Sequence, residues 1–245
     1  MNTADVLAIG AHPDDVEVGC GGTIILAADA DLDVVVATLT SGETASRGTL
    51  DDREHEGERA AEILGATTYP SLGLPDGRVG VDPAHRTALL ELIRELEPRI
   101  VLAPYEQDRH PDHAAAGRLV RETSFLAGLP RLGEGTPHRP AHVYHYMVHH
   151  PFPPSFVVDV SRVWDRKWRA VRAHESQFGP EGGSRGPVDP GRFLQVVEAW
   201  ATVHGAMIGV ERGEAFHSSG PVPVTSLPGL ARLEGEAPSR YQIFH

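Results

Sequence analysis

Short apolar runs alternate along the first half of the chain with longer segments in which apolar residues recur every three or four positions. The short runs, typical of buried strands, lie at 6–9, 34–39, 67–72 and 100–103. The longer segments, which predict helices, lie at 22–30, 52–64, 83–96 and 113–127. In the third of these, Leu89, Leu92, Ile93 and Leu96 form one apolar stripe.

Strand–helix–strand repetition predicts an α/β fold that is Rossmann-like, with a mostly parallel sheet and helices on both faces. Such sheets bind ligands at the carboxyl ends of their strands. The second half is less regular, with strands expected at 142–148 and 156–160 and helices at 164–174 and 193–207. The segment 179–191 is a loop by composition, and a surface connection is favoured over a lid. We expect one domain over 1–245, regular over about 1–130 and less regular over about 131–245.

Composition narrows the class of protein. The chain is 40% hydrophobic and 23% charged, as globular proteins are, and its net charge of −12 argues against nucleic-acid binding. One cysteine, Cys20, excludes an intrachain disulfide. The N-terminal run lacks the features of a signal peptide, and no apolar stretch approaches the ~20 residues of a membrane helix. We therefore expect a cytoplasmic protein that does not contact a membrane.

The first cluster of chemical interest follows the first predicted strand and reads Ala-His-Pro-Asp-Asp. Imidazole and carboxylate are both good zinc ligands, and His12 and Asp15 can converge on one ion if the chain turns between them. Asp14 would then stand free beside the metal, where a general base is needed. The alternative is an acidic helix N-terminus, because carboxylates cap helices well.

A second cluster, Asp-Arg-His-Pro-Asp-His at 108–113, follows the fourth predicted strand. His113 supplies a third metal ligand. His110, when protonated, could stabilise an oxyanion or protonate a leaving amine. Asp112 could orient an imidazole. The alternative is a solvated loop with incidental histidines, but two such clusters after two strands favour a shared site.

These motifs resemble the LmbE-like (PIG-L) family of zinc N-acetylglucosaminyl deacetylases. Further segments, GAHPDDVEVGCGGT, LGLPDG, VLAPYEQDRHPDH and ESQFG among them, resemble its bacillithiol-biosynthesis branch, whose members deacetylate N-acetylglucosaminyl malate. The resemblance implies one Zn²⁺ per chain and a homo-oligomer, possibly a hexamer. It implies these roles: His12, Asp15 and His113 as ligands, Asp14 as base, His110 as oxyanion or amine partner with Asp112 orienting it, and Arg53 and Arg109 at the malate carboxylates.

The sequence therefore predicts a zinc-dependent hydrolase that removes acetate from a small sugar conjugate. Two alternatives stay open. The first is an amidase or deacetylase with the same metal site and another N-acyl substrate. The second is a non-enzymatic metal- or sugar-binding module, which would have no use for a free Asp14 beside the ligands.

Overall fold

The computed structural model describes residues 3–179 and 189–223. Its elements in chain order are β1 (Val6–Gly10), α1 (Asp15–Ala28), β2 (Val34–Thr38), α2 (Leu50–Leu64), α3 (Pro83–Leu96), β3 (Ile100–Pro104), α4 (Pro111–Leu126), β4 (His142–Tyr146), β5 (Phe156–Asp159), a 3₁₀ turn (Ser161–Val163), α5 (Trp164–Ala173), α6 (Glu175–Phe178), α7 (Pro190–Ile208) and β6 (Gly213–His217). No helix among these residues is long and apolar enough to cross a membrane.

The strands form one six-stranded sheet in the order β2-β1-β3-β4-β6-β5. The first four are mutually parallel, and β6 is inserted antiparallel between β4 and β5. The predicted α/β class with a mostly parallel sheet is confirmed, and the sheet takes strands from both halves of the chain.

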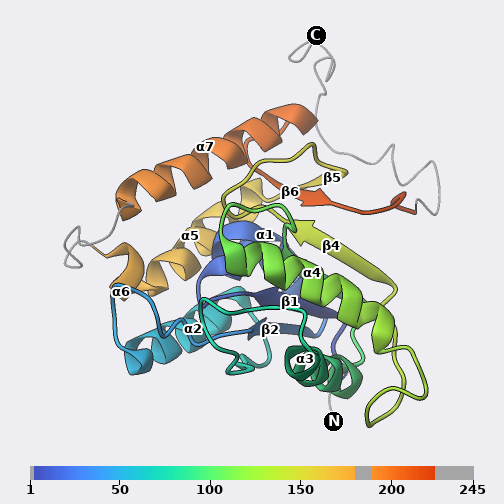
Figure 1. Cartoon of the computed structure of the whole chain (residues 1–245). Helices are drawn as coiled ribbons and strands as arrows, with labels where there is room; N and C mark the ends of the chain where they lie inside the picture. Colours follow the sequence, from blue (N-terminus) through green and yellow to red (C-terminus); the bar gives the residue numbers. More distant parts are fainter. Residues whose placement is uncertain (1–2, 180–188, 224–245) are drawn as a thin grey trace.

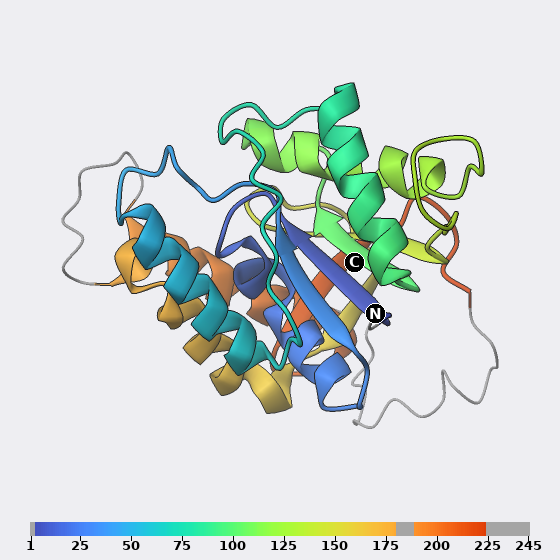
Figure 2. The ribbon, with the colours of Figure 1, turned by 90° about the horizontal axis from the view of Figure 1, so that it is seen from below.

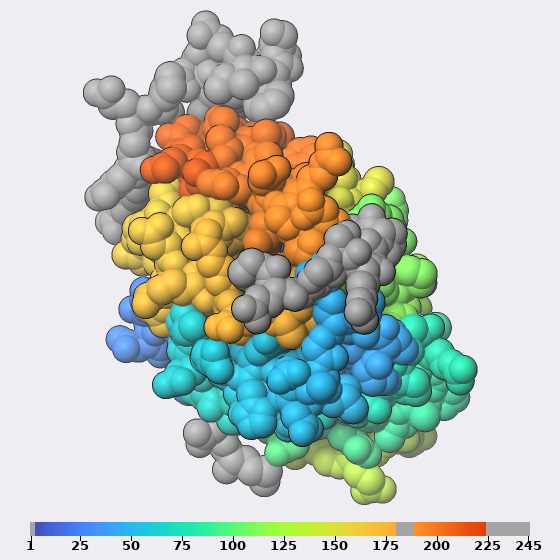
Figure 3. Space-filling view, turned by 90° about the vertical axis from the view of Figure 1, so that its left-hand side faces the viewer, coloured from blue at the N-terminus to red at the C-terminus, as the bar shows by residue number. Residues whose placement is uncertain are grey.

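Helices cover both faces of this sheet (Figures 1 and 2). Along β1, Val6 and Ala8 pack into a core with α1, α5 and α2, whereas Leu7 and Ile9 pack into a second core with α3 and α4. Successive strand residues point to opposite faces, so a strand covered on both sides reads as a continuous apolar run. Helices α2, α5 and α7 form successive bands of the surface in Figure 3.

The elements differ from the prediction at several places, and α1 begins at Asp15, seven residues before the predicted helix at 22–30. The run at 67–72 is not a regular strand, although Thr68 and Ser71 make isolated parallel bridges to β2. Pro70 lies between them and has no N–H to donate to a ladder. Strand β6 was not predicted from its sequence. The predicted loop at 179–191 lies largely in 180–188, outside the described residues.

Helix α1 is broken at Cys20, whose φ of −143° is not helical. The backbone N–H groups of Gly22 and Thr23, just beyond the break, donate to the carboxylate of Glu214 on β6 at 2.8 and 2.7 Å. Lys167 on α5 donates to the same carboxylate at 2.6 Å and to the carbonyl of Val18 at 2.8 Å. This buried group ties the helix that begins at Asp15 to α5 and to β6.

Candidate metal centre and active site

Two loops meet at the carboxyl edge of the sheet. β1 ends at Gly10 and α1 begins at Asp15, while β3 ends at Pro104 and α4 begins at Pro111. β1 and β3 are parallel neighbours, with β2 on the other side of β1. The connection after β1 leads to β2 on one side of it, and the later strand β3 lies on its other side. In sheets of this kind a crevice opens outside the strand ends where the strand order changes direction. The two clusters predicted from the sequence face each other there.

The first loop turns tightly. A Cβ at Gly10 would lie 2.7 Å from the carbonyl oxygen of His12, so only glycine fits. Asp14 has a φ of 104° and makes no capping hydrogen bond with its side chain, which weighs against the helix-capping alternative. For a non-glycine residue this conformation costs about 1–3 kcal/mol, and such strain clusters at functional sites.

Asp15 lies between two histidines. Its Oδ1 is 3.1 Å from Nε2 of His113, and its Oδ2 is 3.6 Å from Nδ1 of His12. The backbone N–H of His12 also donates to Oδ2 at 2.9 Å, which holds the carboxylate in place. One carboxylate and two imidazoles therefore converge, as a zinc site with an open coordination position requires.

The other ring nitrogen of each histidine faces a further carboxylate. Nε2 of His12 lies 3.0 Å from Oδ1 of Asp76 and 3.4 Å from Oδ2 of Asp112. Nδ1 of His113 lies 3.3 Å from Oδ1 of Asp108. Metal-binding histidines usually turn their second nitrogen to a carboxylate in this way, which orients the ring. This arrangement is the structural evidence that these histidines suit a metal.

Asp76 and Asp108 were missed as site residues by the sequence reasoning. Asp76 stands in the LGLPDG segment and Asp108 opens the second cluster, so both lay within motifs already noticed. Asp108 is the more heavily bonded of the two. Besides its contact with His113 it accepts hydrogen bonds from the backbone N–H of His110, His149 and His150.

Among the described residues, three groups have possible metal-ligand atoms that all lie within 4.8 Å of one another. They are His12, His110 and His113; Asp108, His113 and His149; and His12, Asp76 and Asp112. The predicted set of His12, Asp15 and His113 is not one of these groups, and His110 is a further possible donor. Nδ1 of His110, however, accepts the backbone N–H of Asp112 at 3.3 Å, which leaves Nε2 as the nitrogen that could face a metal or a substrate.

The charges at the site favour a cation. Burial lowers the pKa of His12, but hydrogen bonds to Asp112, Asp15 and Asp76 outweigh it and raise that pKa to about 12. Burial also lowers the pKa of His113, while Asp15 and Asp108 raise it to about 9. The carboxylates that stabilise protons on these rings would equally stabilise a divalent ion, which must displace those protons on binding.

The pKa values of Asp14 and His110 are both shifted in the direction that favours the uncharged side chain. Burial raises the pKa of Asp14, and the positive charge of Arg53 opposes that rise. Burial, followed by the charges of His113 and His12, lowers the pKa of His110. The ring of His110 is thus favoured in its neutral form, with its proton on Nε2 because Nδ1 accepts a hydrogen bond.

The site opens into a cavity of about 280 Å³. Both the charged residues of the candidate metal cluster and several apolar side chains line this cavity. The lining residues are His12, Asp14, Asp15, Val18, Thr44, Ala45, Arg53, Asp76, His110, His113, Val148, His149, Phe178 and Phe193.

Residues 7–124 match the family model described as GlcNAc-PI de-N-acetylase, PIG-L. The diacetylchitobiose deacetylase of Thermococcus kodakarensis is 38% identical over 71% of this chain and 70% of its own length. A probable N-acetyl-alpha-D-glucosaminyl L-malate deacetylase 2 of Bacillus anthracis is 30% identical over 72% of this chain and 83% of its own length. The crystal structure of a conserved protein from Thermus thermophilus superposes with a TM-score of 0.83 at 39% identity, covering 92% of this chain and 99% of that one.

The chain belongs to the PIG-L family. The resemblance inferred from AHPDD and HPDH is thereby confirmed, and the family is one of hydrolytic N-deacetylases. Deacetylases of this family are metal-dependent, and the His/Asp cluster is a candidate metal site of this chain.

The PIG-L resemblance also gave roles to Asp112, Arg53 and Arg109. Asp112 directs its carboxylate at His12 and at the N–H groups of Gly77 and Val79, and its backbone N–H donates to Nδ1 of His110, the ring that the resemblance expects it to orient. Arg53 is buried, donates to the carbonyl of Pro13 at 2.8 Å and lies 4.0 Å from Asp14.

Arg109 is exposed and borders a second hollow, of about 420 Å³, next to the metal cavity. The PIG-L resemblance had placed it with Arg53 at one anion site.

Cys20 is buried, and burial raises the pKa of its thiol well above the usual value, which agrees with a packing role.

Proposed function

We propose that this chain hydrolyses the acetamide of an N-acetylglucosaminyl conjugate, with N-acetyl-alpha-D-glucosaminyl L-malate as its substrate, and that it uses one zinc ion. The observation that carries the proposal is the contact of Asp15 with both His12 and His113, with Asp14 partly buried beside them. A deacetylase acting on N-acetylglucosaminyl malate among the relatives supports the substrate.

His12, Asp15 and His113 would hold the zinc ion. We choose Asp15 over His110 as the third ligand because Asp15 contacts both histidines, whereas His110 is partly engaged as the N-cap of α4. When bound, zinc supplies Lewis-acid chemistry, which polarises an acyl carbonyl and makes water more acidic.

Asp14 acts as the general base that takes a proton from the attacking water. Its raised pKa makes it a stronger base than an exposed aspartate, and the positive charge of nearby Arg53 opposes that rise. The water oxygen bonds to the acetamide carbon, and Nε2–H of His110 donates a hydrogen bond to the oxyanion that develops there. The C–N bond then breaks, the nitrogen takes the proton held by Asp14, and the free amine and acetic acid leave, the acid then ionising to acetate.

Arg53 and Arg109 are the proposed contacts of the malate carboxylates. Guanidinium groups suit carboxylates because they can donate two parallel hydrogen bonds. Because the two arginines border different hollows, malate would have to extend from one hollow toward the other. A disaccharide is the competing substrate, since the relative that acts on diacetylchitobiose is 38% identical.

The decisive experiment measures acetate release from N-acetylglucosaminyl malate, diacetylchitobiose and N-acetylglucosamine, with and without chelator. The proposal expects chelator-sensitive release, fastest from the malate conjugate. Faster release from diacetylchitobiose would overturn the malate assignment and keep the deacetylase. Release that persists in metal-stripped protein would overturn the metal assignment.

Three further properties stay predictions. They are a homo-oligomer, possibly a hexamer; a cytoplasmic location; and a single folding unit over 1–245. Analytical ultracentrifugation would test the first, and a single cooperative unfolding transition the last.

A further inference from the structure

A row of aromatic rings leads away from the metal cluster. The rings of His113 and His149 lie 5.0 Å apart at 16°, those of His149 and Phe193 lie 5.3 Å apart at 40°, and those of Phe193 and Phe178 lie 6.2 Å apart at 16°. The outer three rings come from the connection between β4 and β5, from α7 and from α6, so tertiary packing alone brings them together.

Both ends of this row are held in place. Asp108 accepts the backbone N–H of His149 at 2.9 Å and lies 3.2 Å from its ring Nδ1. At the other end, Ser176 in α6 donates its N–H and its hydroxyl to the buried carboxylate of Glu56 at 2.6 and 2.7 Å. This fixes the short helix that carries Phe178. Rings held in this way lose little further freedom when a ligand contacts them.

The row borders open space on the side where a substrate must lie. His149, Phe178 and Phe193 line the cavity of about 280 Å³ that also contains His12, Asp14 and Asp15. His149 and Phe193 also line the neighbouring hollow of about 420 Å³. Phe193 therefore borders both spaces, as His149 does, and a ligand that reaches from one to the other can contact both rings.

We propose that Phe178, Phe193 and the ring of His149 form a platform on which a pyranose ring stacks, and that Phe193 is the residue that determines specificity for the sugar. The C–H groups on the face of a glucosamine ring carry partial positive charge, and the face of an aromatic ring carries partial negative charge. The platform adjoins the carboxylates and histidines through His149, whose ring lies 5.0 Å from that of His113, so a sugar that contacts the rings can also reach the reacting groups. The inference rests on the proposed function, because it takes the ligand to be a glycoside.

The test compares Phe193→Leu and Phe193→Tyr with the wild type in the metal-loaded full chain. Leucine keeps an apolar side chain but lacks a flat face, whereas tyrosine keeps the ring. Phe193→Leu should raise KM for the best of the three substrates about threefold to tenfold, the scale of an aromatic contact. It should leave kcat and metal content nearly unchanged. Phe193→Tyr should keep KM within about twofold of the wild type.

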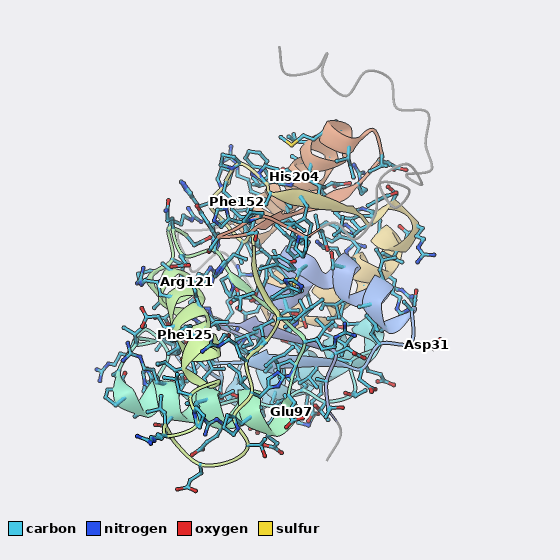
Figure 4. The ribbon with its side chains drawn as sticks, turned by 90° about the vertical axis from the view of Figure 1, so that its right-hand side faces the viewer. Asp31, Glu97, Arg121, Phe125, Phe152 and His204 are labelled. Atoms are coloured by element: carbon cyan, nitrogen blue, oxygen red, sulfur yellow. The ribbon has the colours of Figure 1, made fainter. Side chains whose placement is uncertain are left out.

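Phe125→Leu is the matched control, because Phe125 is 56% exposed on α4 and lies away from α7 (Figure 4). A wild-type KM in Phe193→Leu would overturn the platform, and so would an equal rise of KM in Phe193→Tyr. If the wild type releases acetate from none of the substrates, the proposed function fails and the platform is judged by calorimetric binding of N-acetylglucosamine. In that case, loss of this binding in Phe193→Leu and its retention in Phe193→Tyr support the platform, and equal binding by all three proteins refutes it.

Discussion

The buried ion pair of Lys167 and Glu214 gives a prediction about stability in which the two partners are not equivalent. Each side chain is 2% exposed, and their charged atoms lie 2.6 Å apart. The ammonium of Lys167 also donates to the carbonyl of Val18. The carboxylate of Glu214 has three other donors, namely the N–H of Gly22 and the N–H and hydroxyl of Thr23.

Glu214→Gln leaves the Lys167 ammonium buried without its counter-charge and turns an amide N–H toward other donors. Breaking a buried pair in this way costs about 3–5 kcal/mol. Lys167→Met replaces the ammonium by an unbranched apolar side chain, and the carboxylate that remains still accepts three hydrogen bonds. Its cost should be near that of one hydrogen bond to a charged group, about 1.5–3 kcal/mol. Glu214→Gln should therefore destabilise the protein by about 2 kcal/mol more than Lys167→Met.

Urea denaturation at pH 7, followed by tryptophan fluorescence, measures both free energies of unfolding. Asp29→Asn is the control, because its ion pair with Arg166 has partly exposed side chains and should contribute at most about 1 kcal/mol. If Lys167→Met destabilises the protein as much as Glu214→Gln, the three donors to Glu214 do not stabilise its charge, and the reasoning is refuted.

Three further predictions concern the metal centre and pH. Asp14→Asn should keep its metal and lose about 10²–10⁴ in kcat, as removal of a general base does; simultaneous loss of metal, seen by elemental analysis, would place Asp14 among the ligands. Asp108→Asn should weaken zinc binding about 10- to 100-fold through His113, as loss of a carboxylate behind a metal-bound histidine does; an unchanged Kd in a chelator competition would contradict this. Burial, and then the charge of Lys167, lowers the pKa of His204 to about 4. Because its usual value is 6.5, the unfolded chain binds a proton between pH 6.5 and 4 that the folded protein does not, so stability should fall as pH falls across that range. His204→Gln should reduce this slope in urea titrations, and an identical slope would exclude His204 as its source.

Local patterns were sufficient for much of the fold. Helix α3 spans Pro83–Leu96, the range that its apolar stripe predicted, and the structure adds Asp82 as its N-cap. The strands β1, β2 and β3 are short apolar runs because they are covered on both faces. The alternation of strands and helices then requires parallel pairing, and parallel pairing brings the loops after β1 and β3 to one edge. For that reason the meeting of His12, Asp15 and His113 could be predicted from the sequence alone.

Contacts between distant segments were decided only by the tertiary structure. Asp76 lies 64 positions from His12 in the chain, and nothing in the spacing between them indicates their 3.0 Å contact. Strand β6 has only five residues and a buried glutamate, so its place between β4 and β5 depends on the partners it finds. The separation of Arg53 from Arg109 and the aromatic row through Phe193 arise in the same way. Periodicity reports which face of an element is buried, but which surfaces meet is determined by packing between elements far apart in the sequence.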